Sequence, residues 1–355
     1  MKPHLPIRRA IHERKTYEAP AEGRFGKVRL DFNENTAGCS PSVIRALAKL
    51  SPQFLAMYPE YEASIREFAR YFGVRPGELL FTNGADDAIR AFFDVFVDHG
   101  STVLLCEPTF TMYRYYAEIF AAKIHVSRYD AQMKVPLEKL AAALRRRPRL
   151  LFLANPNNPT GTLITHLQIE HLLKSATHTA VVIDEAYFEF SGVTVLPLIR
   201  KYPQLFIMRT FSKAAGLASL RLGAILARAD SLENIRRAMP PFPVNSAALV
   251  AARAAIRDRR AMRRYVGEVK RLRHWFATKL HRLGVVTYPS GGNFLLANFG
   301  PTGPRLFARL VKAGFLLRDR SLEIGPGFVR ISIGTANEMR RLVRAIHRQW
   351  NNPDA

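Results

Sequence analysis

The chain has 355 residues, of which 48% are hydrophobic and 23% are charged. This composition is ordinary for a globular protein and excludes a collagen-like or disordered chain, and the length predicts two packed lobes rather than one small module. Lysine and arginine number 53 against 29 aspartate and glutamate, so the formal net charge of +24 favours anionic ligands through long-range attraction.

The predicted elements begin, in chain order, with an arm: residues 1–27 show weak periodicity and are expected to lie over another part of the molecule. Ser40 and Pro41 then predict the start of a helix, because a capping hydroxyl is followed by a proline at the first helical position. From there, helix-period segments alternate with short apolar runs, which is the pattern of parallel strands joined by crossover helices. The runs have no polar alternation, as expected for a sheet covered on both faces, and they lie at 102–106, 123–126, 150–154, 180–184, 205–210 and 222–226.

Beyond residue 245 the pattern changes. Long basic helices are predicted at about 247–283, and alternating strands are predicted at 293–299 and 328–333. Thr335 and Glu338 form a capping box at the start of the last helix. The chain is therefore predicted to be an α/β protein, with a large domain built on a mostly parallel central sheet flanked by helices and a smaller α+β domain.

The cellular compartment and metal content are predicted from a few residues. Cys39 and Cys106 lie far apart without a CxxC partner, so we expect neither a disulfide framework nor a thiolate zinc site. His166 and His171 are five residues apart, which does not place them on one helix face, and we predict no metal. No apolar run reaches the roughly 20 residues of a membrane span, and no apolar block follows the basic amino terminus. We expect a cytoplasmic protein without a membrane partner.

Polar residues recur at the carboxyl ends of the predicted strands, where open α/β sheets bind ligands. Residues 83–87, Asn-Gly-Ala-Asp-Asp, follow the apolar run 79–81 and begin a helix whose free amides could hold a phosphate. The alternative is a plain N-cap turn. Residues 155–161, Asn-Pro-Asn-Asn-Pro-Thr-Gly, follow the strand 150–154 as a rigid turn that presents an asparagine amide, with a purely structural turn as the alternative.

Two further strand ends carry an acid and an amine. Asp184 ends one apolar run, where a partly desolvated carboxylate needs a cation or a protonated ring nitrogen as its partner, and Tyr187 could place a phenol beside the same ligand. Lys213 follows another run, and Arg221 comes eight residues later. A lysine at the mouth of a sheet, near phosphate-binding groups, is what a Schiff-base cofactor requires, although a single lysine is more often a solvated surface residue.

Together these segments provide a phosphate cradle, a partner for a ring nitrogen, donors to a phenolic oxygen and an imine-forming lysine, which is the set that pyridoxal 5'-phosphate needs. The chain also resembles the fold-type I aminotransferases and, among them, the histidinol-phosphate aminotransferases. The segments that carry the resemblance are RLDFNENTAGCSP (29–41), YPE (58–60), NGADDAI (83–89), EPTF (107–110), NPNNPTG (155–161), DEAYFEF (184–190), TFSKAAGLASLRLG (210–223), NFLL (293–296) and VRISIGT (329–335).

The resemblance implies a fold-type I architecture with an arm at 1–27, a small domain of 28–39 plus 246–355, and a large pyridoxal-phosphate-binding domain of 40–245. It implies that Lys213 binds the cofactor covalently and then moves the proton, and that Asp184 keeps the ring nitrogen protonated. The other cofactor-binding residues that it implies are Asn158 and Tyr187 at the 3'-oxygen, Phe110 stacked on the ring, Ala85, Asp86, Ser212 and Arg221 at the phosphate, and Tyr58 of a neighbouring subunit, also at the phosphate.

The resemblance also implies substrate-binding residues. Arg330 matches the arginine that faces the acidic end of a substrate, where its planar fork suits a carboxylate or a phosphate. Arg318 and Tyr17 match positions that face the phosphate of histidinol phosphate, and Asn33 would line the substrate pocket. Arg320 lies two residues from Arg318 and competes with it for that assignment.

The activity that the resemblance implies is transfer of the amine of L-histidinol phosphate to 2-oxoglutarate by a homodimer with shared active sites. Aromatic amino-acid transamination and threonine-phosphate decarboxylation are the alternatives on the same fold. A different class, nucleic-acid binding, depends on the +24 charge alone. We do not favour nucleic acid as a partner, since the basic runs at 145–149 and 257–264 lack interleaved aromatic residues for base stacking.

Overall fold

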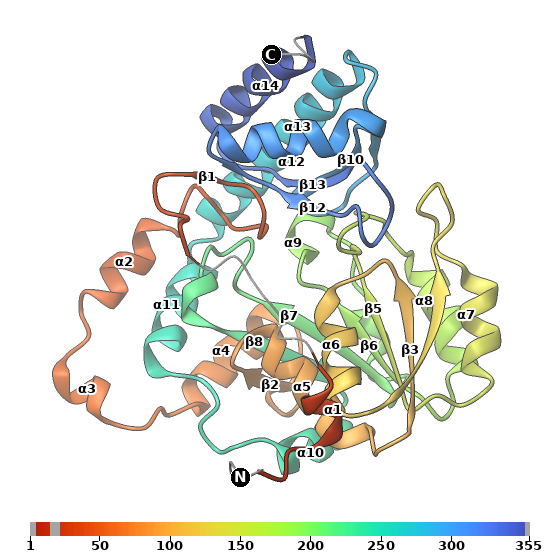
Figure 1. The fold of residues 1–355 in the computed structure, drawn as a ribbon. Coiled ribbons are helices and arrows are strands. Elements are labelled where there is room, and N and C mark those ends of the chain that lie inside the picture. Colours follow the sequence, from red (N-terminus) through yellow and green to blue (C-terminus); the bar gives the residue numbers. More distant parts are fainter. Residues whose placement is uncertain (1–4, 15–21, 352–355) are drawn as a thin grey trace.

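The computed structural model describes residues 5–14 and 22–351, and two lobes are stacked one above the other in it (Figure 1). A seven-stranded sheet forms the centre of the large lobe. The five strands β3 to β7 run parallel to one another, whereas β8 runs antiparallel to both β2 and β7. The order across the sheet is β2 (Leu79–Thr82), β8 (Gly223–Ala227), β7 (Leu205–Thr210), β6 (Ala180–Asp184), β5 (Leu150–Ala154), β3 (Thr102–Glu107) and β4 (Lys123–Arg128).

The mostly parallel sheet predicted from the sequence is confirmed, but the direction of β8 was not foreseen. The connection from β7 to β8 contains only the short turn Ala218–Leu220 as regular structure. Parallel pairing needs a crossover long enough to return the chain to the starting edge of the sheet, usually through a full helix. A short connection between neighbouring strands therefore forces β8 to run antiparallel.

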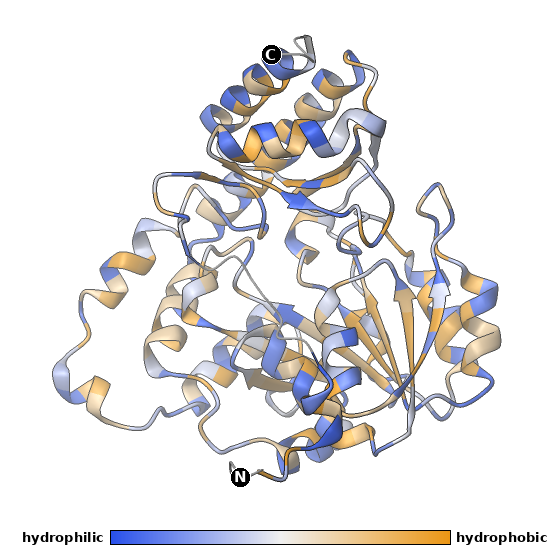
Figure 2. Ribbon diagram, viewed as in Figure 1, coloured by the Kyte–Doolittle hydropathy of each residue, from blue (hydrophilic) through white to orange (hydrophobic). Residues whose placement is uncertain are grey.

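Helices cover both faces of this sheet, which explains the continuous apolar runs of its strands. Consecutive residues of β5, for example Leu151 and Phe152, are fully buried in different core clusters on opposite faces. Figure 2 shows the resulting hydrophobic strands between helices whose outer surfaces are hydrophilic. One face is covered by α5 (Gly84–Phe96), α6 (Thr111–Ile119) and α10 (Ala229–Ala238); the other is covered by α2 (Pro41–Leu47), α4 (Glu62–Phe72), α7 (Leu137–Leu144), α8 (His166–Ser175) and α11 (Ser246–Arg257).

The smaller lobe carries three helices over an antiparallel sheet of order β12 (Arg318–Asp319), β13 (Phe328–Ser332), β10 (Phe294–Asn298) and β9 (Val286–Tyr288). A parallel pair, β1 (Val28–Arg29) with β11 (Phe315–Leu316), joins the segment before α2 to this lobe. The predicted capping box is present, because the Thr335 amide donates to Glu338 Oε2 at 2.7 Å and the Glu338 amide donates to Thr335 Oγ1 at 3.4 Å. The helices are α12 (Arg259–His281), α13 (Gly303–Lys312) and α14 (Ala336–Asn351), and the short helices elsewhere are α1 (Arg9–His12), α3 (Pro52–Ala56) and α9 (Phe188–Ser191).

The domain boundaries remain predictions, and the packing of α11 bears on one of them. Its side chains Ala248, Leu249 and Ile256 belong to the core cluster of the large lobe, where α11 contacts α2 and α4. This packing favours a division near Asp258, between α11 and α12, rather than at residue 246. Within the part of the chain that the structure describes, no helix is both long enough and apolar enough to cross a membrane.

Candidate active site

A cavity of about 330 Å³ lies at the carboxyl ends of the parallel strands and reaches the arginines of the small lobe. It brings together twelve of the fourteen predicted site residues, although these are spread over most of the chain. These are Asn33, Ala85, Asp86, Phe110, Asn158, Asp184, Tyr187, Ser212, Lys213, Arg221, Arg318 and Arg330, and the competing Arg320 lines the same cavity.

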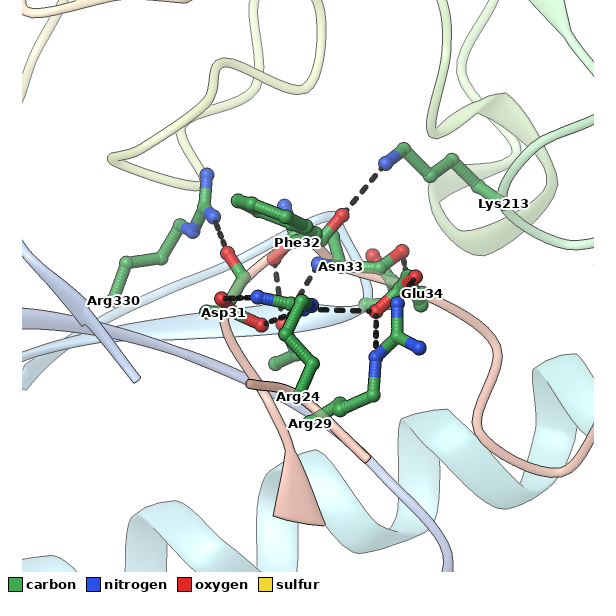
Figure 3. A network of polar contacts seen from close by, with 10 residues as sticks. Arg24, Arg29, Asp31, Phe32, Asn33, Glu34, Lys213 and Arg330 are labelled. Atoms are coloured by element: carbon green, nitrogen blue, oxygen red, sulfur yellow. Dashed lines mark hydrogen bonds and ion pairs between the residues drawn. The ribbon is translucent and has the colours of Figure 1, made fainter. Parts of the chain in front are cut away.

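Lys213 lies just beyond the end of β7, and its Nζ donates to the backbone oxygen of Phe32 at 2.9 Å (Figure 3). Burial lowers the pKa of this amine from 10.5 to about 8, and the positive charge of Arg330 adds to the effect, against the opposing charges of nearby carboxylates. With this lowered pKa, about a tenth of the amine is neutral at pH 7, against far less than a hundredth for an ordinary lysine. A neutral amine is the form that attacks a carbonyl carbon, so the site prepares Lys213 to act as a nucleophile.

This pKa predicts how the apoprotein takes up pyridoxal 5'-phosphate. The rate of covalent uptake should rise about tenfold per pH unit below 8 and level off above it, because the neutral fraction of Lys213 follows that profile. Stopped-flow absorbance from pH 6 to 10 measures it, with Nα-acetyl-lysine as the reference amine, whose rate should keep rising toward its ordinary pKa of about 10.4. An inflection of the protein's profile near that reference value would contradict the desolvated environment.

Asp184 ends β6 at the bottom of the cavity. Burial raises the pKa of its carboxyl group, while a hydrogen bond from Tyr113, the amide of Ala186 and the charge of Lys213 act in the opposite direction. The Tyr113 hydroxyl donates to Asp184 Oδ2 at 2.6 Å, and the Ala186 amide donates to Oδ1 at 3.0 Å. Sequence reasoning missed Tyr113; its helical spacing of three residues from Phe110 places it on the buried face of α6, which a core tyrosine would share.

Tyr187 and Asn33 both line the cavity and are joined by a hydrogen bond. The Asn33 side-chain amide donates to the Tyr187 hydroxyl at 2.8 Å, and the Ser332 hydroxyl donates to Asn33 Oδ1 at 2.9 Å. Burial raises the pKa of Tyr187, so its phenol remains a protonated donor near neutral pH. Asn158 accepts a hydrogen bond from Arg330 through its side-chain oxygen, which leaves its amide NH₂ available to an oxygen in the cavity.

The start of α5 forms a cradle for an anion. Ala85 and Asp86 occupy the first turn of this helix, where free amides and the positive end of the helix dipole are directed at the cavity. Arg221 Nη2 lies 2.9 Å from Asp86 Oδ2, and the Thr210 hydroxyl donates to Ser212 Oγ at 3.0 Å. The Asp86 carboxylate therefore holds the guanidinium of Arg221 in place, and the backbone of residue 86 is the part suited to a phosphate.

Gly223 permits the close approach on which this cradle depends. A Cβ at this position would lie 2.7 Å from Thr82 Oγ1 and 2.8 Å from the backbone carbon of Gly84. We predict that Gly223→Ala lowers the free energy of unfolding by about 1–3 kcal/mol and weakens pyridoxal 5'-phosphate binding, since the helix start must shift. Urea unfolding and a cofactor titration measure the two effects.

Gly267, in the middle of α12, provides the matched control. An added Cβ there would meet no atom within 4 Å. Gly267→Ala should stabilise the helix by roughly 0.5–1 kcal/mol and leave cofactor binding unchanged. Equal effects of the two substitutions on cofactor binding would rule out the role assigned to Gly223.

Three arginines face the cavity from the small lobe. Arg318 and Arg330 are directly opposite each other in the antiparallel pair β12–β13, so their side chains lie on the same face of the sheet. Arg320 is two residues further along, and its amide donates to the Phe328 oxygen at 2.9 Å, which continues that register. Burial, together with the neighbouring charges of Arg320 and Arg318, lowers the pKa of Arg330 from 12.5 to about 9, against the opposing effects of Tyr187 and Asp31.

Such a juxtaposition of like charges is unfavourable in the absence of an anion. Arg320 is 3% exposed, and its Nη1 donates to both carboxylate oxygens of Glu323, to Oε1 at 2.7 Å and to Oε2 at 2.8 Å. The choice between Arg318 and Arg320 is therefore not exclusive, because both line the cavity.

A network of ion pairs and hydrogen bonds, drawn in Figure 3, supports the segment 31–34, which contacts Lys213 and Arg330. The buried Arg24 forms two hydrogen bonds of 2.7 Å with the carboxylate of Asp31, and Glu34 accepts from Arg29 at 3.0 Å. The backbone oxygens of Asp31 and Phe32 then accept from Arg330 and Lys213 respectively. Arg24 and Asp31 were not among the predicted site residues.

Two predicted residues are not found in the cavity. Tyr58 is 78% exposed, and its ring stacks on Phe242 with 4.5 Å between the centroids. Its predicted role in a neighbouring subunit's site remains a prediction. Tyr17 lies outside the described residues.

The donor set fits pyridoxal 5'-phosphate. A buried amine of lowered pKa, a buried carboxylate and an anion cradle with an arginine are arranged around one cavity, with Phe110 also on its lining. Lys213 would hold the aldehyde carbon, Asp184 the ring nitrogen, Tyr187 and Asn158 the phenolic oxygen, and the cradle at α5 the phosphate. The fold and this donor set define a Schiff-base enzyme of the amino-group-transferring kind.

Comparison with known proteins agrees with this class. Residues 26–346 match the family described as aminotransferase class I and II, and the chain belongs to that family. The histidinol-phosphate aminotransferase of Geobacillus sp. (strain WCH70) is 34% identical over 327 residues, which cover 90% of this chain and 89% of that protein. The histidinol-phosphate aminotransferase of Anoxybacillus flavithermus (strain DSM 21510 / WK1) is 32% identical over 354 residues, which cover 98% and 93%.

The same fold is seen in the crystal structure of histidinol-phosphate aminotransferase from Sinorhizobium meliloti in complex with pyridoxal-5'-phosphate. The TM-score is 0.91 over 99% of both chains, at 22% sequence identity. The predicted fold-type I architecture and the predicted family are thereby confirmed.

Proposed function

We propose that the protein uses pyridoxal 5'-phosphate to transfer the amino group of L-histidinol phosphate to 2-oxoglutarate, giving imidazole acetol phosphate and glutamate in histidine biosynthesis. The observation that carries this proposal is the set of three cavity-lining arginines on one face of the small sheet. A phosphate dianion relieves the repulsion among these side chains and matches the planar fork of a guanidinium. The names of the relatives that share about a third of the sequence point to the same substrate.

The chain's own residues account for the chemistry as follows. The cofactor, when bound, supplies an electron-accepting ring that stabilises negative charge on the carbon bearing the substrate's amino group. Lys213 Nζ takes the proton from that carbon, and its lowered pKa suits proton transfer near neutral pH. Asp184 holds a proton on the ring nitrogen, and Arg318 and Arg330 bind the acidic end of the substrate.

The test is a coupled assay that measures glutamate formed from histidinol phosphate and 2-oxoglutarate. Comparison of kcat/KM for histidinol phosphate and phenylalanine by glutamate formation, and for threonine phosphate by release of carbon dioxide, separates the three activities of this fold. The proposal predicts the highest value for histidinol phosphate. Absence of glutamate, with cofactor bound, would overturn the substrate while leaving the aminotransferase family intact.

We also propose a cytoplasmic homodimer. The helices α2 and α3 project from the body of the large lobe in Figure 1, and large apolar side chains on them, on the two residues after α3 and at Phe242, which stacks on Tyr58, are exposed in the single chain. Such a patch favours association with a second copy of the chain. Sedimentation equilibrium measures the mass, and a fully active monomer would overturn the shared site. The patch consists of Ile44, Phe54, Leu55, Met57, Tyr58 and Phe242.

A further inference from the structure

Tyr113 contacts the site through one hydrogen bond, and it does not line the cavity. Its side chain is fully buried on α6, and its ring stacks on Phe152 of β5 at 4.6 Å with an interplanar angle of 9°. It also meets the edge of the Phe110 ring at 5.7 Å. These ring contacts leave the hydroxyl directed at Asp184 Oδ2, 2.6 Å away.

We propose that Tyr113 is a positioning residue for Asp184: its hydroxyl fixes one carboxylate oxygen, the Ala186 amide fixes the other, and together they orient the ionised carboxylate toward the cofactor's ring nitrogen. Each carboxylate oxygen has a second lone pair, so these two bonds leave Asp184 able to accept one more. The proposal rests on the cofactor and not on the identity of the amine substrate.

The hydroxyl is needed because the rest of the surroundings oppose an ionised Asp184. Burial raises the pKa of this carboxyl group, and the charge of Asp86 on α5 raises it further. Tyr113, the Ala186 amide and the charge of Lys213 lower it, while the phenol of Tyr187 lies on the cavity side. The pKa of Tyr113 is itself raised well above 10 by burial and by Asp184, so its hydroxyl remains a donor throughout the working range of pH.

A packing role alone would not require the hydroxyl. Phenylalanine has the same ring and would keep the stack on Phe152 and the edge contact with Phe110. Tyr113→Phe therefore separates the hydrogen bond from the packing. The matched control is Tyr129→Phe, which removes the hydroxyl of another buried tyrosine, one that contacts Cys106 away from the cavity.

The experiment measures the dissociation constant of pyridoxal 5'-phosphate by fluorescence between pH 5 and 9, in variants that unfold at the same temperature as the parent. Tyr113→Phe should weaken binding by about 10- to 100-fold, the range for a hydrogen bond to a charged group. It should also move the acid limb of the affinity profile to higher pH, because loss of a donor to the ionised form raises the pKa of Asp184. Tyr129→Phe should change neither quantity.

The same substitution in an Asp184→Asn background tests whether Tyr113 acts through Asp184. The effect should then fall to a small fraction of its value in the parent. An equal loss of affinity in both backgrounds would assign Tyr113 a purely structural role, and an unchanged affinity and acid limb in Tyr113→Phe would overturn the proposal outright. If Tyr113→Phe is unstable, 3-fluorotyrosine at position 113, a stronger donor of similar shape, should move the acid limb to lower pH, and no movement would overturn it.

Discussion

Replacing Lys213 by alanine is expected to lower kcat by about 10²–10⁴-fold or more, the range attributed to a positioned proton-transfer group, with the loss of the covalent link added to it. The amine is the lowered-pKa nitrogen in a cavity that also holds Asp184 and the cradle at α5. The variant should bind pyridoxal 5'-phosphate without covalent attachment, because the phosphate and ring contacts come from other residues. Borohydride reduction followed by mass spectrometry reports the missing link.

The control for this substitution is Lys201→Ala. Lys201 is a surface lysine whose Nζ lies 2.6 Å from Glu170, away from the cavity. It should retain the parent kcat and the parent mass shift on reduction. If Lys213→Ala kept more than a tenth of the parent kcat, the assignment of the amine would be wrong.

The second large effect is expected from Arg330→Met. We predict that kcat/KM for histidinol phosphate falls by roughly 10²–10³-fold, as expected when one partner of a desolvated, hydrogen-bonded charge contact is removed. Thermal stability should change little, because the substitution removes two hydrogen bonds, to Asn158 and to the Asp31 oxygen, but also a buried cation that faces Arg318 and Arg320. Steady-state kinetics and calorimetry measure the two quantities.

Histidinol, which lacks the phosphate, separates substrate binding from general damage in this variant. The parent and Arg330→Met should use histidinol with similar low efficiency, because this substrate has no phosphate for Arg330 to bind. Arg228→Met is the control protein, because Arg228 pairs with Asp230 on the surface, where the two side chains are 39% and 64% exposed. Retention of the parent kcat/KM for histidinol phosphate in Arg330→Met would show that this arginine does not face the anion.

The central sheet was the part of the fold most readily predicted from the sequence. The runs 150–154 and 180–184 match β5 and β6 residue by residue, because both faces of these strands are buried and a polar residue marks where each ends. The short strands β11 and β12 were not predicted. They contain two residues each, and their existence depends on pairing with β1 and β13 rather than on any local pattern.

The predictability of the site follows the same division. Asp184 and Lys213 could be identified because each follows an apolar strand, and topology then places those strand ends together. Tyr113, Arg24 and Asp31 could not be identified, because what matters in each is a contact that the chain makes only after folding. Tyr113 is 71 positions in sequence from Asp184, whose carboxylate accepts its hydrogen bond, and nothing in the local sequence distinguishes it from a tyrosine of the core.

The antiparallel direction of β8 has a consequence for how this protein can vary. Lys213 and Arg221 both lie in the connection between β7 and β8, which is closed where Thr210 pairs with Gly223. Adding or deleting a residue between them would alter this loop, and with it the relative positions of the amine and the guanidinium in the cavity, without changing the pairing of β7 with β8. We therefore expect the length of the loop between Lys213 and Arg221 to be more tightly constrained than the identity of the residues in it.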